Sequence, residues 1–267
     1  MPDVDDQYID VPFDEQPEFT FGMIEPSAFE TYSAYEDAVP MLEWNEIDAA
    51  IDAMDAQDDG LEWLVTRIFD QKQEGSCVAN ACAQAHQIIQ ARQFGVDSVI
   101  DLSAISLYKQ IGRSASSGAM VSDGLEVMCS KGILPLDTPK NRELFGKAVM
   151  PNTGFNTKYP DDWQVTAELL VGLEYHRCTT PQGLYTAGVN RDPIIVGREG
   201  HSICYARPRR KGAVRSFAYP NSWSLNWGVA LGNLTGGWGI DTQGQTEKSA
   251  KSCYVLRAVK IPLLGVA

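Results

Sequence analysis

The order in which two hydrophobic periodicities follow each other constrains this chain's fold more than any other feature. Apolar residues recur at helical spacing between residues 78 and 89, and two more helices are predicted near 103–111 and 122–131. A turn-rich segment at 150–163 follows, expected to pass between lobes. The predicted strands then come at 166–175, 193–196, 202–206, 214–219 and 253–259. Helices followed by strands predict an α+β fold of two lobes, not an alternating parallel sheet.

Charge divides the chain differently. Residues 1–60 contain 18 Asp or Glu and no Lys or Arg, and the remaining 207 residues carry 17 acidic and 22 basic side chains. We predict an acidic N-terminal arm over residues 1–60 and one domain over 61–267, with lobes at about 61–150 and 151–260. A block of one sign is typical of a solvated tail or of a segment that docks on a basic surface. A nucleic-acid partner is not expected, because the arm repels phosphate and the rest is only mildly basic.

The arm contains one predicted amphipathic helix, over residues 42–57. Its apolar positions are Trp44, Ile47, Ile51 and Met54, with Gly60 as a stop. We expect this stripe to pack on the chain's own domain. The alternative is a docking surface for a protein partner.

A short run of basic residues in the C-terminal half of the chain has the charge opposite to that of the acidic arm. We expect its side chains to form a solvated hairpin tip, and the alternative is contact with the acidic arm, within the chain or from a neighbouring subunit. The run consists of Arg207, Arg209, Arg210 and Lys211.

Several classes of protein are excluded by what the sequence lacks. No apolar run approaches the ~20 residues of a membrane-spanning helix. The first ten residues, MPDVDDQYID, contain neither the basic region nor the apolar region of a secretory signal. We therefore expect a cytoplasmic protein, or one within a protein assembly, with no membrane partner. The six cysteines form no CxxC pair and the three histidines are far apart in sequence. We therefore expect no metal and no cofactor, and we expect the cysteines to be free thiols.

A cysteine stands where the first helix begins. Gly75 and Ser76 form a turn, with Ser76 as N-cap, so Cys77 occupies the first helical turn. Unpaired N–H groups and the helix dipole stabilise a thiolate there, which is the active form of a cysteine nucleophile. A small core residue is the competing interpretation of this feature alone.

A base for this cysteine has to be one of three histidines. His86 lies about 13 Å along the same helix at ~1.5 Å per residue and cannot reach the sulfur, and His176 has the setting of a strand residue. His201 follows Gly200 and opens a strand. If that strand turns at Lys211, partner numbers sum to 422 and His201 faces Asn221, whose amide can orient the imidazole.

These residues resemble the signature of the papain-like cysteine peptidases. Gln71 stands six residues before Cys77 in a Q-x3-G-S-C setting, Gly200-His201-Ser202 opens a strand, and residues 221–228 match N-S-W-x-x-x-W-G without a gap. The resemblance covers about residues 60–260. It implies a cysteine endopeptidase in which a Cys77–His201 thiolate–imidazolium pair attacks a peptide or protein substrate and Asn221 orients the base. The oxyanion is then held by the Gln71 side chain and the Cys77 N–H.

The same resemblance implies the shape of the molecule. A helical left lobe and an antiparallel β-barrel-like right lobe are expected, with the active-site cleft between them. Trp223 is expected to shield the His201–Asn221 hydrogen bond and line the cleft. The region around Gly118 and Met120 is expected to form part of the substrate wall.

The chain also departs from the family pattern. Val78 replaces the usual Trp, and Glu74 replaces a cysteine, which removes a left-lobe disulfide and is expected to raise the pKa of the nucleophile modestly. The arm lacks the basic helical motif of family pro-segments. Either it is not a pro-segment that is removed by self-cleavage, or the molecule is in its uncleaved form.

Two other functions fit parts of the sequence. One is a structural or assembly component that uses the fold without catalysis and docks partners through the arm. The other is a cell-wall hydrolase of the Cys-His type, whose signatures lack the N-S-W element. The joint presence of Gln71, Cys77, His201, Asn221 and Trp223 favours peptidase chemistry, since a scaffold does not need all five.

Overall fold

The computed structural model describes residues 32–198, 200–250 and 252–262. The helices are α1 (Tyr35–Ala38), α2 (Trp44–Gln57), α3 (Cys77–Phe94), α4 (Ala104–Ile111), α5 (Val121–Ser130), α6 (Pro139–Phe145), α7 (Trp163–Ala167), α8 (Pro181–Val189) and α9 (Gln243–Ser249), with 3-10 turns at Leu61–Leu64 and Val96–Ser98. The strands are β1 (Val171–Cys178), β2 (Ile194–Arg198), β3 (His201–Tyr205), β4 (Arg207–Lys211), β5 (Val214–Pro220), β6 (Val229–Leu231), β7 (Leu234–Ile240) and β8 (Cys253–Lys260). Within these ranges no helix is both long and apolar enough to cross a membrane.

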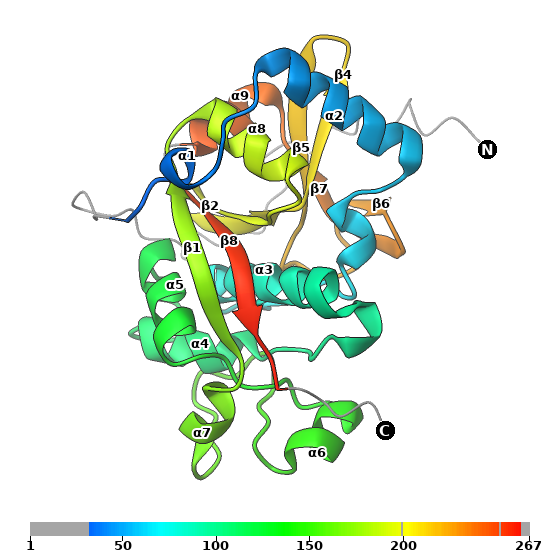
Figure 1. Cartoon of the computed structure of the whole chain (residues 1–267). Coiled ribbons are helices and arrows are strands. Elements are labelled where there is room, and N and C mark those ends of the chain that lie inside the picture. The colour runs from blue at the N-terminus through cyan, green and yellow to red at the C-terminus, as the bar shows by residue number, and fades with distance from the viewer. Residues whose placement is uncertain (1–31, 199, 251, 263–267) are drawn as a thin grey trace.

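The strands form two antiparallel four-stranded sheets, in the orders β1-β8-β2-β3 and β4-β5-β7-β6. Helices α3 to α7 gather in one half of the molecule, the helical lobe, while both sheets with α8 and α9 make up the β lobe (Figure 1). This arrangement confirms the predicted α+β fold of two lobes.

Helix α3 lies where the lobes meet. It packs on α4 and α5 on one side and on β3 and β8 on the other, and every residue from Cys77 to Ala91 is buried. Its polar side chains are used internally: Gln87 and Gln90 each accept a backbone N–H from the chain segment beside the helix, at Leu102 and Ile100. The helix ends before Gly95, whose φ of 87° is a positive value that glycine adopts readily at the end of a helix.

The strand predicted over residues 166–175 is only partly correct. Helix α7 occupies its first part, and β1 begins at Val171. The apolar run misleads because its residues are not all buried: Leu173 is 61% exposed, and Val165, directly before the run, is 67% exposed. Periodicity alone therefore could not distinguish a surface turn of helix from a strand.

The single hairpin predicted from His201 to Asn221 is also wrong. Strand β3 pairs with β2, placing His201 opposite Arg198, and the chain enters the second sheet after Ala206. The real hairpin, β4–β5, pairs Lys211 with Val214, so partner numbers sum to 425 instead of 422. Its turn contains Gly212, whose φ of 61° is readily available to glycine.

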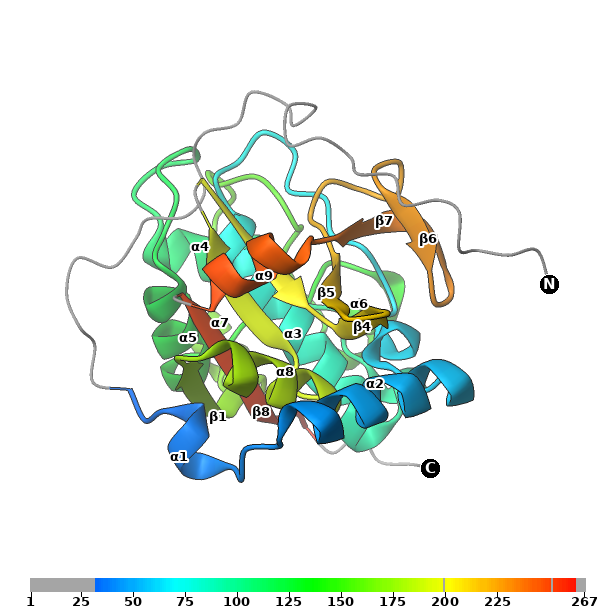
Figure 2. The ribbon, with the colours of Figure 1, turned by 90° about the horizontal axis from the view of Figure 1, so that it is seen from above.

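Helix α2, predicted over residues 42–57, packs on the β lobe. It begins at Trp44 behind a capping box of Glu43 and Glu46 and ends at Gln57, before Asp58 in the left-handed conformation rather than at Gly60. Figure 2 shows it lying alongside α8, and it also contacts β4.

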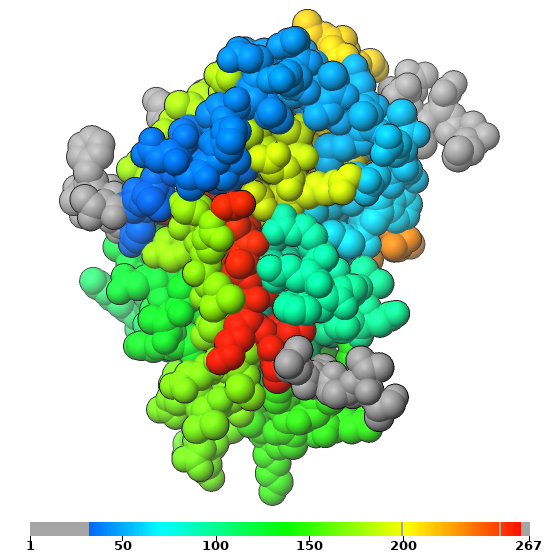
Figure 3. Space-filling view, viewed as in Figure 1, coloured from blue at the N-terminus to red at the C-terminus, as the bar shows by residue number. Residues whose placement is uncertain are grey.

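The apolar stripe of α2 is part of the core of the β lobe. Ile47 and Ile51 are fully buried, in the same cluster as Tyr205 and Phe217 of the sheets. Burying each such side chain stabilises the folded state by about 1.5–3 kcal/mol. The space-filling view shows this N-terminal segment lying directly against the β lobe (Figure 3).

The acidic face of α2 meets the basic hairpin β4–β5. Arg215 binds Asp48 through two bonds of 2.6 and 2.8 Å. One turn along, Asp52 accepts two bonds from Arg210. The solvated tip predicted for the basic run is therefore wrong for Arg210 and for Arg207, which is buried and pairs with Asp55, and contact with acidic residues of the same chain is observed.

Candidate active site

Cys77 is the first residue of α3 and is fully buried. Ser76 occupies the N-cap position but makes no capping bond with its side chain. Its hydroxyl and carbonyl instead accept the Asn80 amide, at 3.0 and 2.8 Å. The turn before the helix is thus fixed by Asn80, one turn further into α3.

Burial dominates the electrostatics of this thiol. It raises the pKa of Cys77 to about 12, although the backbone N–H groups of Ser202, Val78 and Cys77 itself act in the opposite direction. The helix start therefore supplies the stabilising donors that were predicted, but desolvation outweighs them. At neutral pH the resting thiol is protonated. The Ser202 contact also places the sulfur beside the residue that follows His201.

His201 opens β3 and is 7% exposed. Burial lowers its pKa to about 4, the Asn221 hydrogen bond acts to raise it, and the Arg198 cation lowers it further. The imidazole is therefore neutral near pH 7, like the thiol, so the resting pair is not the expected thiolate–imidazolium pair, because burial disfavours both charged forms.

The imidazole tautomer follows from the Asn221 amide. Asn221 Oδ1 lies 2.8 Å from the Ser222 backbone N–H, which can only donate, so this atom is the amide oxygen. The same oxygen lies 2.9 Å from His201 Nε2. Nε2 therefore carries the hydrogen, and Nδ1 is left with a lone pair that can accept a proton.

Trp223 covers the imidazole. Its ring stacks on that of His201 with centroids 4.8 Å apart and planes 27° apart. Trp227 meets Trp223 edge-on at 5.2 Å. An apolar cover of this kind keeps water from competing for the His201–Asn221 bond.

Gln71 is held from both lobes. Its backbone N–H donates to Ser222 O at 2.9 Å, and its Oε1 accepts the Ser222 hydroxyl. Its Nε2 donates to Glu74 O at 2.8 Å, which uses one of two amide hydrogens. The neighbouring residues Asp70 and Trp223 form an isolated antiparallel β-bridge. The segments that carry Gln71 and Asn221 are therefore joined directly.

The other residues singled out in the sequence lie in loops connected to the turn before α3. Gly118, with a φ of 68°, and Met120, the N-cap residue of α5, belong to a loop that accepts the Gly75 N–H at Ala115 O. Glu74 Oε1 accepts two backbone N–H bonds, of 2.9 and 2.8 Å, from residues 154 and 155. Glu74 thus anchors a loop, and burial is the main cause of the raised pKa of Cys77.

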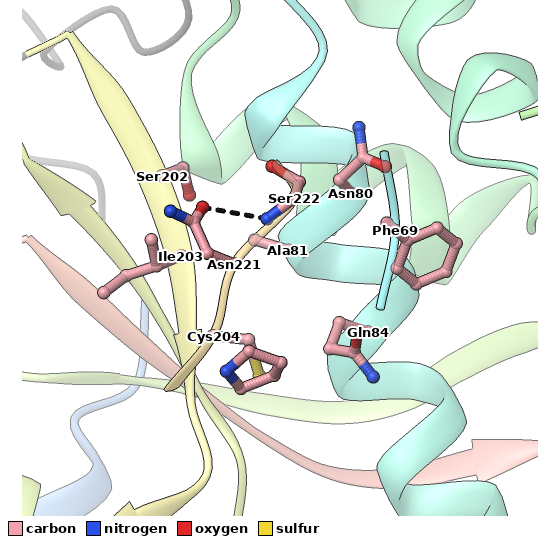
Figure 4. Close-up of a pocket in the computed structure, with 10 residues that line it drawn as sticks. Phe69, Asn80, Ala81, Gln84, Ser202, Ile203, Cys204, Asn221 and Ser222 are labelled. Carbon is pink, nitrogen blue, oxygen red and sulfur yellow. Dashed lines mark hydrogen bonds between the residues drawn. The ribbon is translucent and has the colours of Figure 1, made fainter. Parts of the chain in front are cut away.

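A small cavity lies behind the candidate site, with room for about one water molecule. Asn80 and Gln84 of α3 line one side, and Ser202, Asn221 and Ser222 line the other (Figure 4). Asn80 and Gln84 were not predicted from the sequence as part of this region. The available signal was the spacing of the two amides at three and seven positions after Cys77, inside a helix otherwise rich in apolar residues.

The other two histidines lie elsewhere. His86 is buried, with Nδ1 3.0 Å from the Gln90 amide. His176, on β1 as predicted, contacts Ser33 and Glu174, each at 2.9 Å. Among the described residues no group of three or more metal-binding side chains is found.

No protein-family model matches the chain, and no curated protein matches it by sequence. The structure is similar to solved cysteine proteases. Xylellain from Xylella fastidiosa has a TM-score of 0.64 at 17% identity, covering 90% of this chain and 97% of that chain. Digestive procathepsin L 3 of Tenebrio molitor gives 0.57 at 13%, covering 90% and 74%, and procathepsin B S9 from Trypanosoma congolense gives 0.54 at 11%, covering 91% and 87%. The chain has the papain-like two-lobe fold.

Proposed function

We propose that this protein is a cysteine peptidase that hydrolyses peptide bonds, with Cys77 as nucleophile and His201 as general base. Asn221 orients the imidazole, and Gln71 supplies an oxyanion donor. The observation that carries the proposal is the His201–Asn221 hydrogen bond of 2.9 Å beneath Trp223, because it leaves Nδ1 of His201 free to accept a proton beside the start of α3.

The reaction follows from the protonation states. His201 Nδ1 takes the Cys77 proton as the sulfur attacks the substrate carbonyl, and the imidazolium is stabilised through Nε2–H by Asn221 Oδ1. The Cys77 N–H and the second hydrogen of Gln71 Nε2 stabilise the oxyanion. Proton return from His201 releases the amine, and water then hydrolyses the thioester.

The test is chemical labelling followed by turnover. Full-length protein is treated with an epoxysuccinyl thiol probe, and its mass and peptide map are measured. A single label on Cys77 is expected, with hydrolysis of fluorogenic peptides. Both are lost in Cys77→Ala, and labelling slows at least ~100-fold in His201→Ala, as loss of a general base implies.

Matched variants separate catalysis from folding. His86→Gln removes a buried histidine outside the candidate site, and Cys204→Ala removes a buried cysteine of β3. Both are expected to keep labelling at Cys77. If the folded wild-type protein shows no labelling of Cys77 and hydrolyses no peptide in a library, the peptidase proposal is wrong and a non-catalytic use of the fold becomes the better account.

A further inference from the structure

Two cysteines outside the candidate active site face each other across a pair of strands. The antiparallel register of β1 and β8 places Cys178 opposite Cys253. Opposite residues of such a pair project to the same face, with Cα atoms about 4.5–5.5 Å apart. A disulfide spans Cα separations of ~4.4–6.8 Å. The backbone therefore already meets the main geometric requirement for a bond between these two residues.

The two thiols lie within hydrogen-bonding reach of each other, and Cys178 Sγ also lies 3.7 Å from Glu36 Oε1 and 3.5 Å from Thr180 O. Cys253 Sγ donates to the Cys178 carbonyl at 3.5 Å, so it is directed across to the partner strand. Hydrogen bonding with Cys253, followed by burial, raises the pKa of Cys178. Both side chains are fully buried and both are free thiols.

The other cysteines have no such partner. All six lie in the part of the chain that the structure describes. Cys77 and Cys82 belong to α3, Cys129 belongs to α5, and Cys204 of β3 faces Ile195 in the register with β2. Only one cysteine pair among the described residues occupies opposite positions of paired strands.

We propose that Cys178 and Cys253 form a cross-strand disulfide when the chain folds in the presence of a low-molecular-weight disulfide such as oxidised glutathione. One thiolate attacks the glutathione disulfide, forming a mixed disulfide and releasing one glutathione thiolate. The second protein thiolate then attacks the mixed disulfide and releases the second glutathione. The two protein thiols lose two protons and two electrons, and one oxidised glutathione becomes two reduced molecules. Exchange takes place during folding, because Cys178 and Cys253 are packed inside the core of the β lobe, whereas Cys77 begins the helix that lies where the lobes meet.

The bond would enclose the active-site half of the β lobe. Strands β2 to β7, with His201 and Asn221, lie between its two ends in sequence. Closing so long a loop restricts the unfolded chain more than the folded one, so the oxidised protein is expected to unfold about 5–10 °C higher than the reduced protein.

The test uses the full chain with Cys77→Ala, which removes the candidate nucleophile from the exchange. The protein is unfolded in urea under reducing conditions, refolded in a glutathione redox buffer, alkylated and mapped by mass spectrometry. We expect a loss of about 2 Da for the two thiol hydrogens, and one cross-linked peptide joining Cys178 and Cys253. The higher melting temperature should disappear on reduction.

Matched substitutions on the Cys77→Ala background identify the partners. Cys178→Ala and Cys253→Ala should each abolish the cross-link, whereas Cys204→Ala should retain it. Alkylation of all five remaining thiols after refolding, or a cross-link between any other pair, would overturn the proposal. Because the peptide map is read on protein that keeps both cysteines, the result stands even if a substituted chain fails to fold.

Discussion

At the scale of single residues, one amide oxygen organises the candidate site. Asn221 Oδ1 receives the Ser222 N–H and the His201 Nε2–H together. Ser222 in turn gives its hydroxyl to Gln71. The orientation of the proposed base and that of the proposed oxyanion donor are therefore linked through two adjacent residues, so a change at either end is expected to disturb both.

Gln71→Ala tests the oxyanion role. Losing one such donor typically lowers kcat by about 10²–10³ with little change in KM, because the bond forms only when negative charge develops on the substrate oxygen. Steady-state kinetics on a fluorogenic peptide give the two constants. Gln73→Ala, an exposed glutamine in the same loop, is the control and should keep wild-type kinetics. An unchanged kcat in Gln71→Ala would remove this residue from the mechanism.

His86 predicts a dependence of stability on pH. Burial lowers its pKa to about 4, below the ~6.5 of an exposed histidine. As the pH falls from 6.5 to 4, the unfolded chain binds the proton first, so the free energy of unfolding decreases. The full effect is about 3 kcal/mol at 1.36 kcal/mol per pKa unit.

Urea unfolding between pH 7 and pH 4 measures this effect. His201 has the same direction of shift and contributes equally to wild type and to His86→Gln. The variant should therefore lose less stability than wild type over this range. Parallel curves for the two proteins would contradict the assignment.

At the scale of elements, the contact between α2 and the β4–β5 hairpin has one buried centre. Arg207 is 4% exposed, and it pairs with Asp55 at 2.6 Å and with the buried Glu62 at 3.4 Å. Burial raises the pKa of Glu62 and the Arg207 cation lowers it. The outer pair of Arg210 and Asp52 is more exposed, so solvent and salt screen it.

Arg207→Met is expected to lower the free energy of unfolding by about 3–5 kcal/mol, because it leaves a buried carboxylate without its cation. Arg210→Met, on the same strand, should have a much smaller effect. Chemical denaturation of both variants measures the difference. Adding Glu62→Gln to Arg207→Met should recover part of the loss, and equal effects of the two single substitutions would argue against a buried pair.

Sequence patterns predicted the elements whose signals are local. The apolar spacing of Ile47, Ile51 and Met54 gave the helix α2, and the turn before Cys77 gave the start of α3. Strand pairing was not local: His201 faces Arg198 rather than Asn221, because the chain changes sheets at a point that no turn residue marks. The proximity of His201 and Asn221 was thus predicted through a wrong register.

At the scale of the whole molecule, residues 32–57 belong to the β lobe. Tyr35 donates to the buried Asp192 at 3.0 Å, Glu36 accepts the two N–H groups that precede α8, and α2 fills part of the core. A removable cover would not share a core with the domain it covers. This segment is therefore expected to be needed for the fold.

Truncation tests this expectation. A chain starting at Leu61 should lose its cooperative thermal transition and bind a hydrophobic dye, because the surface beneath Ile47 and Ile51 becomes exposed. A chain starting at Tyr32 is the matched control and should unfold cooperatively. Circular dichroism and dye fluorescence report both properties. A Leu61 chain as stable as the longer one would show that α2 is dispensable.

The position of β8 sets the order in which the molecule can be completed. Although it is the last strand in sequence, it lies between β1 and β2 in the sheet. During synthesis on a ribosome, β3, which begins at His201, can pair with β2, but β1 has no partner strand in the sheet until residues 253–260 emerge. A ribosome must therefore deliver residues 253–260 before β1 can enter the sheet, so the β lobe is completed only after its other described strands have been translated.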